Sequence, residues 1–234
     1  MHEETPAGIA GIGALAEPGR RALYEYVAAQ PDPVGREQAA AAVGIPVHSA
    51  KFHLDRLVSE GLLEFEFRRL SGRTGPGAGR PAKLYRRSAT EFSVSLPERR
   101  YDLAGQILAT AVDLSIRDGL PVDAVVRDVA VESGRDLGAR SPRDKAERER
   151  TADVLSAQGY EPRLSQDEMV LANCPFDALA REHTALVCDL NQGFVEGVLD
   201  GLGCANLQAC LDPEPGLCCV RVRSLSDQAG GPGR

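Results

Sequence analysis

The stretch VHSAKFHLDRLVSEGLLEFEF, residues 47–67, decides the fold of the first third of the chain. Its first half places apolar residues such as Leu54 and Leu57 at helical spacing, on one face. Gly61 then favours the left-handed backbone that ends many helices. Beyond it, residues 62–70 alternate between apolar and charged side chains, which predicts a strand. The stretch therefore predicts a helix that leads directly into a strand.

The flanking segments extend this pattern in both directions. Residues 19–30 have helical periodicity, and the Ala-rich residues 36–43 favour a second, short helix. A Gly/Pro-rich loop separates the first strand from residues 83–88, which predict a second strand. Helix, short helix, longer helix and hairpin is the order of a winged helix-turn-helix. We therefore expect this DNA-binding fold over residues 18–88, after a flexible N-terminus at residues 1–17.

Basic charge is concentrated in the predicted hairpin. The whole chain has a formal net charge of −7, yet residues 62–87 hold seven basic and two acidic side chains, a net of +5. A charge run is often only a solvated surface, but a basic segment next to a candidate recognition helix favours binding to nucleic acid. The residues that we expect to contact DNA lie on this helix and the wing: His48, Ser49, Lys51, Phe52, Arg56, Arg68, Arg73, Arg80 and Lys83.

The segments HLDRLVSEGLLEFEF and GRPAKLYRRS resemble the bacterial winged-helix regulators grouped as ArsR-like. The resemblance covers roughly residues 18–88. It implies that the helix opening at Val47 enters the major groove of a double-stranded DNA operator. It also implies that the wing lies along the DNA backbone.

Residues 97–158 show the patterns of further helices, with an apolar stripe that includes Leu103, Ile107 and Leu114. In a regulator, a long helix after the wing is often the dimerisation element. Two-fold symmetry would also double the contacts of a single recognition helix. We therefore expect residues 97–158 to form a helical dimerisation region in a homodimer.

Residues 159–226 predict a second, α+β domain. Two short strands surround the turn SQDE, a helix interrupted by glycines follows, and CCVRVRSL alternates as a final strand. The fold class is therefore α+β, and residues 227–234, rich in glycine, should form a disordered tail. The sequence shows no apolar run of the roughly 20 residues that a membrane helix needs and no basic leader. We expect a cytoplasmic protein without a membrane partner.

All six cysteines lie in this last domain, between residues 174 and 219. In a reducing compartment, thiols gathered in this way favour a metal or redox role over structural disulfides. Their wide spacing differs from the CxxC pairs of zinc ribbons, so the fold must bring them together. Four thiolates suit an iron–sulfur cluster, and His183 would allow a zinc site of three cysteines and one histidine. Buried cysteines also serve simply as small hydrophobic residues.

The phrases NCPF, LVC, GVLDGLG and LDPEPGLCCVRV resemble the C-terminal domain of ArsR-like regulators related to the repressor of the SUF iron–sulfur assembly operon. The resemblance implies a repressor with a [4Fe–4S] cluster on four widely spaced cysteines. The ligands carried over are Cys174, Cys188, Cys204 and Cys219, with Cys218, Cys210 and His183 as alternates. Because adjacent strand residues face opposite sides, we expect only one of the pair at 218–219 to reach a shared site.

Two other interpretations remain open at the level of sequence. In the first, the cysteines bind structural zinc or merely pack, and the regulator senses a small ligand. In the second the chain is an enzyme, but it has no CxxC, GxSxG, P-loop or dinucleotide fingerprint. The sequence therefore predicts a non-enzymatic DNA-binding regulator that senses redox or iron–sulfur status.

Overall fold

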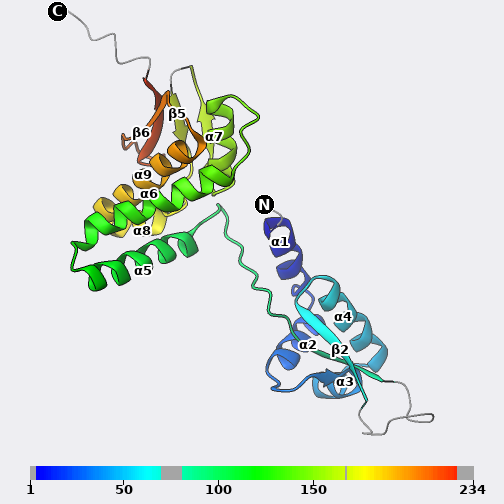
Figure 1. Ribbon diagram of the computed structural model, residues 1–234. Helices are drawn as coiled ribbons and strands as arrows, with labels where there is room; N and C mark the ends of the chain where they lie inside the picture. Colours follow the sequence, from blue (N-terminus) through cyan, green and yellow to red (C-terminus); the bar gives the residue numbers. More distant parts are fainter. Residues whose placement is uncertain (1–3, 70–80, 167, 226–234) are drawn as a thin grey trace, which may run out of the picture. The chain divides into compact units, whose positions relative to one another are not determined.

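The computed structural model describes residues 4–69, 81–166 and 168–225 of the 234-residue chain. The chain forms two compact units, residues 1–94 and residues 95–234, and both mix helices with antiparallel strands (Figure 1). The expected α+β class is confirmed. The expected tail at residues 227–234 lies outside the described residues.

Four helices and a small sheet make up the described part of the first unit. The elements are α1 (Glu4–Ala14), α2 (Pro18–Ala28), β1 (Val34–Gly35), α3 (Arg36–Val43), α4 (Val47–Ser59), β2 (Leu63–Arg68) and β3 (Ala82–Arg87). The strand order is β1-β3-β2, and Phe65 of β2 lies opposite Tyr85 of β3. Leu23, Leu54 and Leu57 are fully buried between the helices and the sheet.

Local chemistry accounts for the ends of these helices. The Glu17 carboxylate accepts hydrogen bonds from the backbone N–H groups of Gly19 and Arg20, at 3.0 and 2.6 Å, which caps the start of α2. Gly44 ends α3 with φ of 74°, and Gly61 follows α4 with φ of 76°. Both positions need the left-handed backbone that glycine adopts without steric cost. The predicted helices and hairpin strands are thus confirmed as elements.

The N-terminal segment departs from expectation, because residues 4–14 form α1 instead of a flexible arm. Gly11 lies directly against the ring of Phe92, since a Cβ at this glycine would approach the ring to 2.7 Å. Gly8 similarly lies against Ser93 and Val94, which follow Phe92 in the chain. The helix is therefore held by a contact with residues about 80 positions away in sequence, which local patterning does not reveal.

The second unit has five helices and four strands in its described part. They are α5 (Tyr101–Asp118), α6 (Val122–Arg140), α7 (Glu147–Ser156), β4 (Pro162–Leu164), β5 (Glu168–Leu171), α8 (Asp177–Glu182), α9 (Thr184–Leu202), β6 (Leu207–Leu211) and β7 (Val220–Ser224). The antiparallel strand order is β4-β5-β7-β6. Helix α9 packs on the sheet, α6 packs on α9, and α5 packs on α6 (Figure 1).

The boundary expected between a helical region and a cysteine-rich domain is absent from this unit. Ile107 of α5 and Leu155 of α7 belong to the same buried core as Leu171, Val198 and Val222. Residues 97–158 and 159–226 therefore fold as one body, because the helices have no core apart from the one they share with the sheet. Strand β6 was also not predicted.

Glycines bring α6 and α9 into backbone contact. A Cβ on Gly197 would lie 1.9 Å from the carbonyl oxygen of Val131, and one on Gly134 would lie 2.0 Å from that of Phe194. Gly201 of α9 and Gly138 of α6 are equally close to the facing helix. No side chain fits between the helices at these positions, so glycine is required by space and not by backbone angle.

None of the helices in the described ranges combines the length and apolar character needed to cross a bilayer.

Candidate functional site

Four of the six cysteines converge on one open cleft of the second unit. Cys174 follows β5, Cys188 lies in the first turn and a half of α9, and Cys218 and Cys219 directly precede β7. All four line a cleft of about 360 Å³, whose rim includes the exposed Arg181 of α8. Segments far apart in the sequence therefore present their thiols to a common space.

Three of these thiols share one buried hydrogen-bond donor, the side-chain amide of Asn191. Cys174 and Cys219 are the neighbours that most affect the pKa of Cys218, and Cys188 is a further neighbour of Cys219. The amide nitrogen Nδ2 of Asn191 lies 3.1 Å from Cys218 Sγ and 4.0 Å from the Sγ atoms of Cys174 and Cys219. One buried donor thus serves three sulfur atoms.

Asn191 is fixed in this orientation by the core. Its side chain is fully buried, and its Oδ1 accepts a hydrogen bond of 2.6 Å from the hydroxyl of Tyr160, which is also buried. The oxygen is satisfied by the tyrosine, so the N–H groups are left to point at the sulfur atoms. A buried amide that is fully bonded in this way is rigid and costly to replace.

The neighbouring thiols shift one another's pKa values in opposite directions. Hydrogen bonds from Cys174 and Cys219 lower the pKa of Cys218 well below its ordinary value, against the opposing effect of burial. The hydrogen bond to Cys218 and then burial raise the pKa of Cys174, and the same two causes raise the pKa of Cys219. A thiolate is the form of cysteine that binds metals and reacts as a nucleophile.

The structure does not bring Cys204 to this cleft, although it was an expected ligand. Cys188 and Cys204 lie near opposite ends of α9, and 16 residues of helix correspond to roughly 24 Å. Cys204 Sγ instead lies 3.6 Å from both Thr151 Oγ1 and Arg150 Nη2 of α7. The position of Cys204 is therefore explained by packing at the far end of the helix.

Of the alternate ligands, Cys210 and His183 lie outside the cleft and Cys218 lines it. Cys210 lies on β6, where its thiol donates to the carbonyl oxygen of Arg221 at 3.7 Å. His183 is exposed at the junction of α8 and α9 and does not line the cleft. Both Cys218 and Cys219 do line it, contrary to the expected alternation, because β7 begins only at Val220.

The possible donors at the cleft are four thiols. Among the described residues, no three or more His, Cys, Asp or Glu side chains are grouped so that they could hold a metal ion. The side-chain amide of Asn191 lies within hydrogen-bond distance of three of the four sulfur atoms, those of Cys174, Cys218 and Cys219. Iron–sulfur clusters are held by four cysteine thiolates, and structural zinc also accepts four. The cleft is about ten times the volume that one water molecule occupies in the liquid, which leaves room for a polyatomic centre.

The first unit presents a second candidate surface, the outer face of α4. Four of the five helix residues expected to contact DNA are exposed there: His48, Lys51, Phe52 and Arg56. Ser49 is half-buried, and the side chain of Phe52 is 66% exposed. The opposite face holds the helix to the core through Ala50, Leu54 and Leu57.

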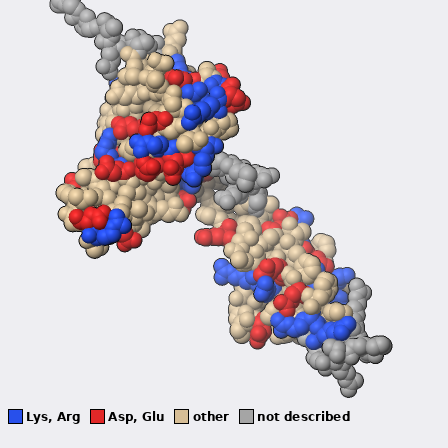
Figure 2. All heavy atoms as spheres, viewed as in Figure 1, with Lys and Arg blue, Asp and Glu red and all other residues tan. Residues whose placement is uncertain are grey.

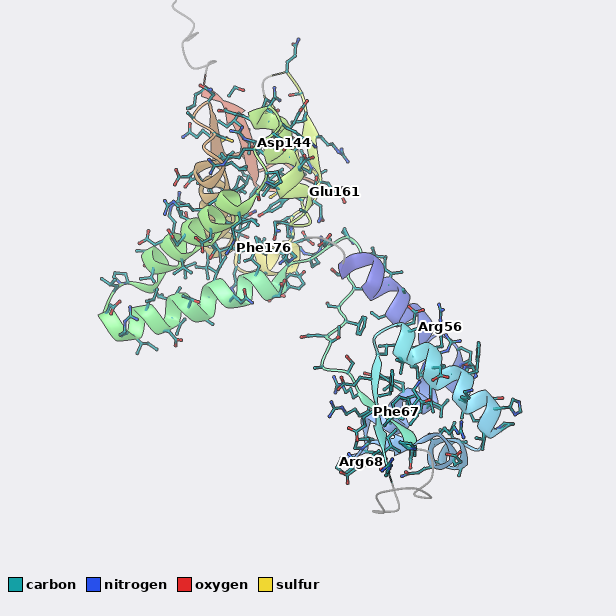
Figure 3. The ribbon with its side chains drawn as sticks, turned by 45° about the vertical axis from the view of Figure 1, so that its right-hand side comes forward. Arg56, Phe67, Arg68, Asp144, Glu161 and Phe176 are labelled. Carbon is teal, nitrogen blue, oxygen red and sulfur yellow. The ribbon has the colours of Figure 1, made fainter. Side chains whose placement is uncertain are left out.

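The described cations of the hairpin are mostly held by ion pairs within the protein. Lys83 Nζ lies 2.6 Å from Asp55 Oδ1 and 4.2 Å from the centre of the Phe65 ring. Arg68 pairs with its neighbour Glu66 near the end of β2, next to Phe67 in Figure 3. Figure 2 accordingly shows blue and red side chains interspersed on the visible face of this unit. Arg73 and Arg80, the other expected wing contacts, lie outside the described residues.

Arg56, labelled on α4 in Figure 3, also has an ion-pair partner, since its Nη2 lies 2.5 Å from Oε1 of Glu60 at the end of the helix. Lys51 has no ion pair among the described residues.

The residue that the sequence patterns missed is Asn191, which lies three residues after Cys188 and therefore on the same face of α9.

Comparisons with models of protein families, with curated proteins and with solved structures found no match to this chain.

Proposed function

We propose that this chain is a DNA-binding transcriptional regulator whose second unit holds an iron–sulfur cluster on Cys174, Cys188, Cys218 and Cys219. The observation that carries the proposal is the convergence of these four thiols on one cleft, around a single buried amide. Cys218 and Cys219 are both ligands in this proposal, and Cys204 is not.

The element order of the first unit supports the DNA-binding half of the proposal. The sequence α2, β1, α3, α4, β2, β3 is the order of a winged helix-turn-helix, in which α4 is the recognition helix. Its exposed His48, Lys51 and Phe52 offer a donor or acceptor, a cation and an apolar ring to base edges and thymine methyl groups. Phosphate contacts then come from cations that are not already neutralised, Lys51 foremost.

Three observations support a cluster at the cleft. The ligands would be four thiols without histidine, which suits iron–sulfur chemistry. Asn191 would donate N–H groups to the ligand sulfurs, and such hydrogen bonds tune the reduction potential of a cluster. The buried side chains of Asn191 and of Tyr160 behind it would exclude water from the inner side. When bound, the cluster would supply a redox-sensitive link between the loop after β5, helix α9 and the loop before β7.

The fold gives the thiols a route to the remainder of the second unit. Cys188 and Asn191 lie on α9, which contacts α6 backbone to backbone, and α6 carries α5. A change in the positions of the three thiol-bearing segments would therefore shift whole helices and not only single side chains. We further propose a homodimer through the outer face of α5, where Val112 and Ile116 are 43% and 78% exposed.

The test is the metal content of cysteine variants purified without oxygen from iron-replete cells. Wild-type protein should contain iron and acid-labile sulfide in equal amounts and should absorb broadly near 400 nm. Serine at Cys174, Cys188, Cys218 or Cys219 should remove most of the iron, because serine is a poor ligand. Serine at Cys204 or Cys210 is the matched control and should leave the iron content unchanged.

Three other outcomes are distinguishable. Zinc in place of iron, lost in the same four variants, would identify a structural zinc site. Loss of iron in Cys204→Ser but not in Cys218→Ser would refute the ligand set drawn from the cleft. Metal-free wild-type protein that still binds its operator would refute the sensor half of the proposal.

A further inference from the structure

A second concave site lies between α5 and α6, away from the thiol cleft. The groove has a volume of about 610 Å³, within the range of sites that bind small molecules. Its floor and walls are aliphatic and come from Leu103, Ile107, Leu114, Val125 and Val129. The two helices diverge enough to leave Leu103 and Leu114 only half-buried.

One side of this groove is a stripe of carboxylates. Asp128, Glu132 and Asp136 lie at successive turns of α6, at i, i+4 and i+8, and all three line the groove. Glu132 pairs with Arg135. Within the part of the chain that the structure describes, Asp128 and Asp136 have no ion-pair or hydrogen-bond partner. Like charges at this spacing repel one another and destabilise a helix slightly, so the stripe has no evident structural benefit.

We propose that the α5–α6 groove binds an organic cation with an apolar body. The aliphatic walls would accept the body, and the charge would lie along the acidic stripe, next to the carboxylate of Asp128 or of Asp136. The chemistry excludes an anion of the same shape, because it would meet the stripe of like charge. This site is independent of the iron–sulfur proposal, since it shares no residue with the thiol cleft.

A second copy of α5 is a poorer occupant of the groove. The polar residues of α5 include Asp102, Asp113 and Asp118, against a single basic residue, Arg117, which already pairs with Asp118. Its charges would therefore add to the acidic stripe and not neutralise it. The apolar side chains proposed for the dimer, Val112 and Ile116, do not line the groove.

The test is calorimetric titration of the full-length protein with hexyltrimethylammonium, with hexanoate and 1-hexanol as probes of the same apolar length. The cation should bind with one site per chain, and the other two probes should bind at least tenfold more weakly. The double variant Asp128→Asn/Asp136→Asn should weaken binding of the cation about threefold, as expected for the loss of one exposed charge pair.

The matched control is Asp113→Asn/Asp144→Asn, which removes the same net charge from exposed positions outside the groove. It should bind the cation as wild type does, and circular dichroism should show both double variants folded. The proposal is overturned if wild-type protein binds no cation, if hexanoate or hexanol binds equally well, or if both double variants lose affinity alike. Dissociation of a dimer by the cation in sedimentation would show that a second copy occupies the groove, which also overturns it.

Discussion

Replacing Gly197 by alanine should destabilise the second unit severely, although alanine is the better helix former. A Cβ at this position would lie 1.9 Å from the carbonyl oxygen of Val131 and 2.8 Å from the backbone nitrogen of Arg135. Ordinary contact begins near 3.4 Å, so the two backbones must separate locally by about 1.5 Å. No rotamer change relieves the overlap, because the opposing atoms belong to α6 itself.

The magnitude follows from two opposing contributions. Overpacking a core costs about 1–3 kcal/mol and occasionally more, and a clash with backbone belongs at or above the upper end. The same separation would also loosen the contacts at Gly134 and Gly201 on the same interface. Alanine recovers up to about 1 kcal/mol of helix propensity. The net loss should be about 3 kcal/mol, which corresponds to roughly 6–12 °C in Tm for a unit of this size.

The assay is thermal and urea unfolding followed by circular dichroism at 222 nm, since the chain has no tryptophan. Gly105→Ala on α5 is the matched control, because a Cβ there meets nothing within 4 Å. It should be neutral or more stable than wild type by up to about 1 kcal/mol. Gly197→Ala with wild-type stability would refute the backbone contact between α6 and α9.

Three further predictions concern the candidate sites. Burial raises the pKa of Asp55, but hydrogen bonds from Lys83 and Tyr85 and the charge of Lys83 outweigh it and lower the pKa. The stabilisation is therefore present above the unfolded value of about 3.9 and is lost as pH falls through the folded pKa. Free energies of unfolding in urea should be higher for wild type than for Asp55→Asn by up to about 1 kcal/mol at pH 7, and the two should converge as pH falls below the folded pKa. Asn191→Leu should cost about 2–4 kcal/mol, because it leaves the buried Tyr160 hydroxyl without an acceptor, and a double-mutant cycle with Tyr160→Phe should show coupling above about 0.5 kcal/mol; additivity would contradict the bond. Lys51→Gln should reduce the slope of log affinity for DNA against log salt by about one, and an unchanged slope would exclude a phosphate contact.

The first unit was largely predictable because its signals are local. Helical spacing around Leu54 and Leu57, the glycine at 61 and the alternation in residues 62–70 all act over a few residues, and the structure has a helix, a turn and a strand at those places. Helix α1 was missed because its support comes from Phe92, beyond the hairpin. No pattern within residues 1–17 carries that information.

The sequence predicted that thiols form a common site, but it did not predict which cysteines belong to it. Sequence shows that thiols cluster, yet it does not show which ends of the elements meet. A helix predicted to continue to Gly203 already implies that Cys188 and Cys204 lie far apart, and this signal outweighs the even spacing of the cysteines. The sequence pattern starts the final strand at Cys218, whereas β7 begins two residues later at Val220, and that difference admits both thiols to the cleft.

The cleft also orders the thiols by their access to solvent. Cys218 is only 2% exposed, whereas Cys174 and Cys219 on either side of it are partly exposed along the open rim. A reagent arriving from solution therefore meets Cys174 and Cys219 before it meets Cys218. Chemical modification at this place would begin at the two outer thiols, and Cys218 is shielded by the same two residues that lower its pKa.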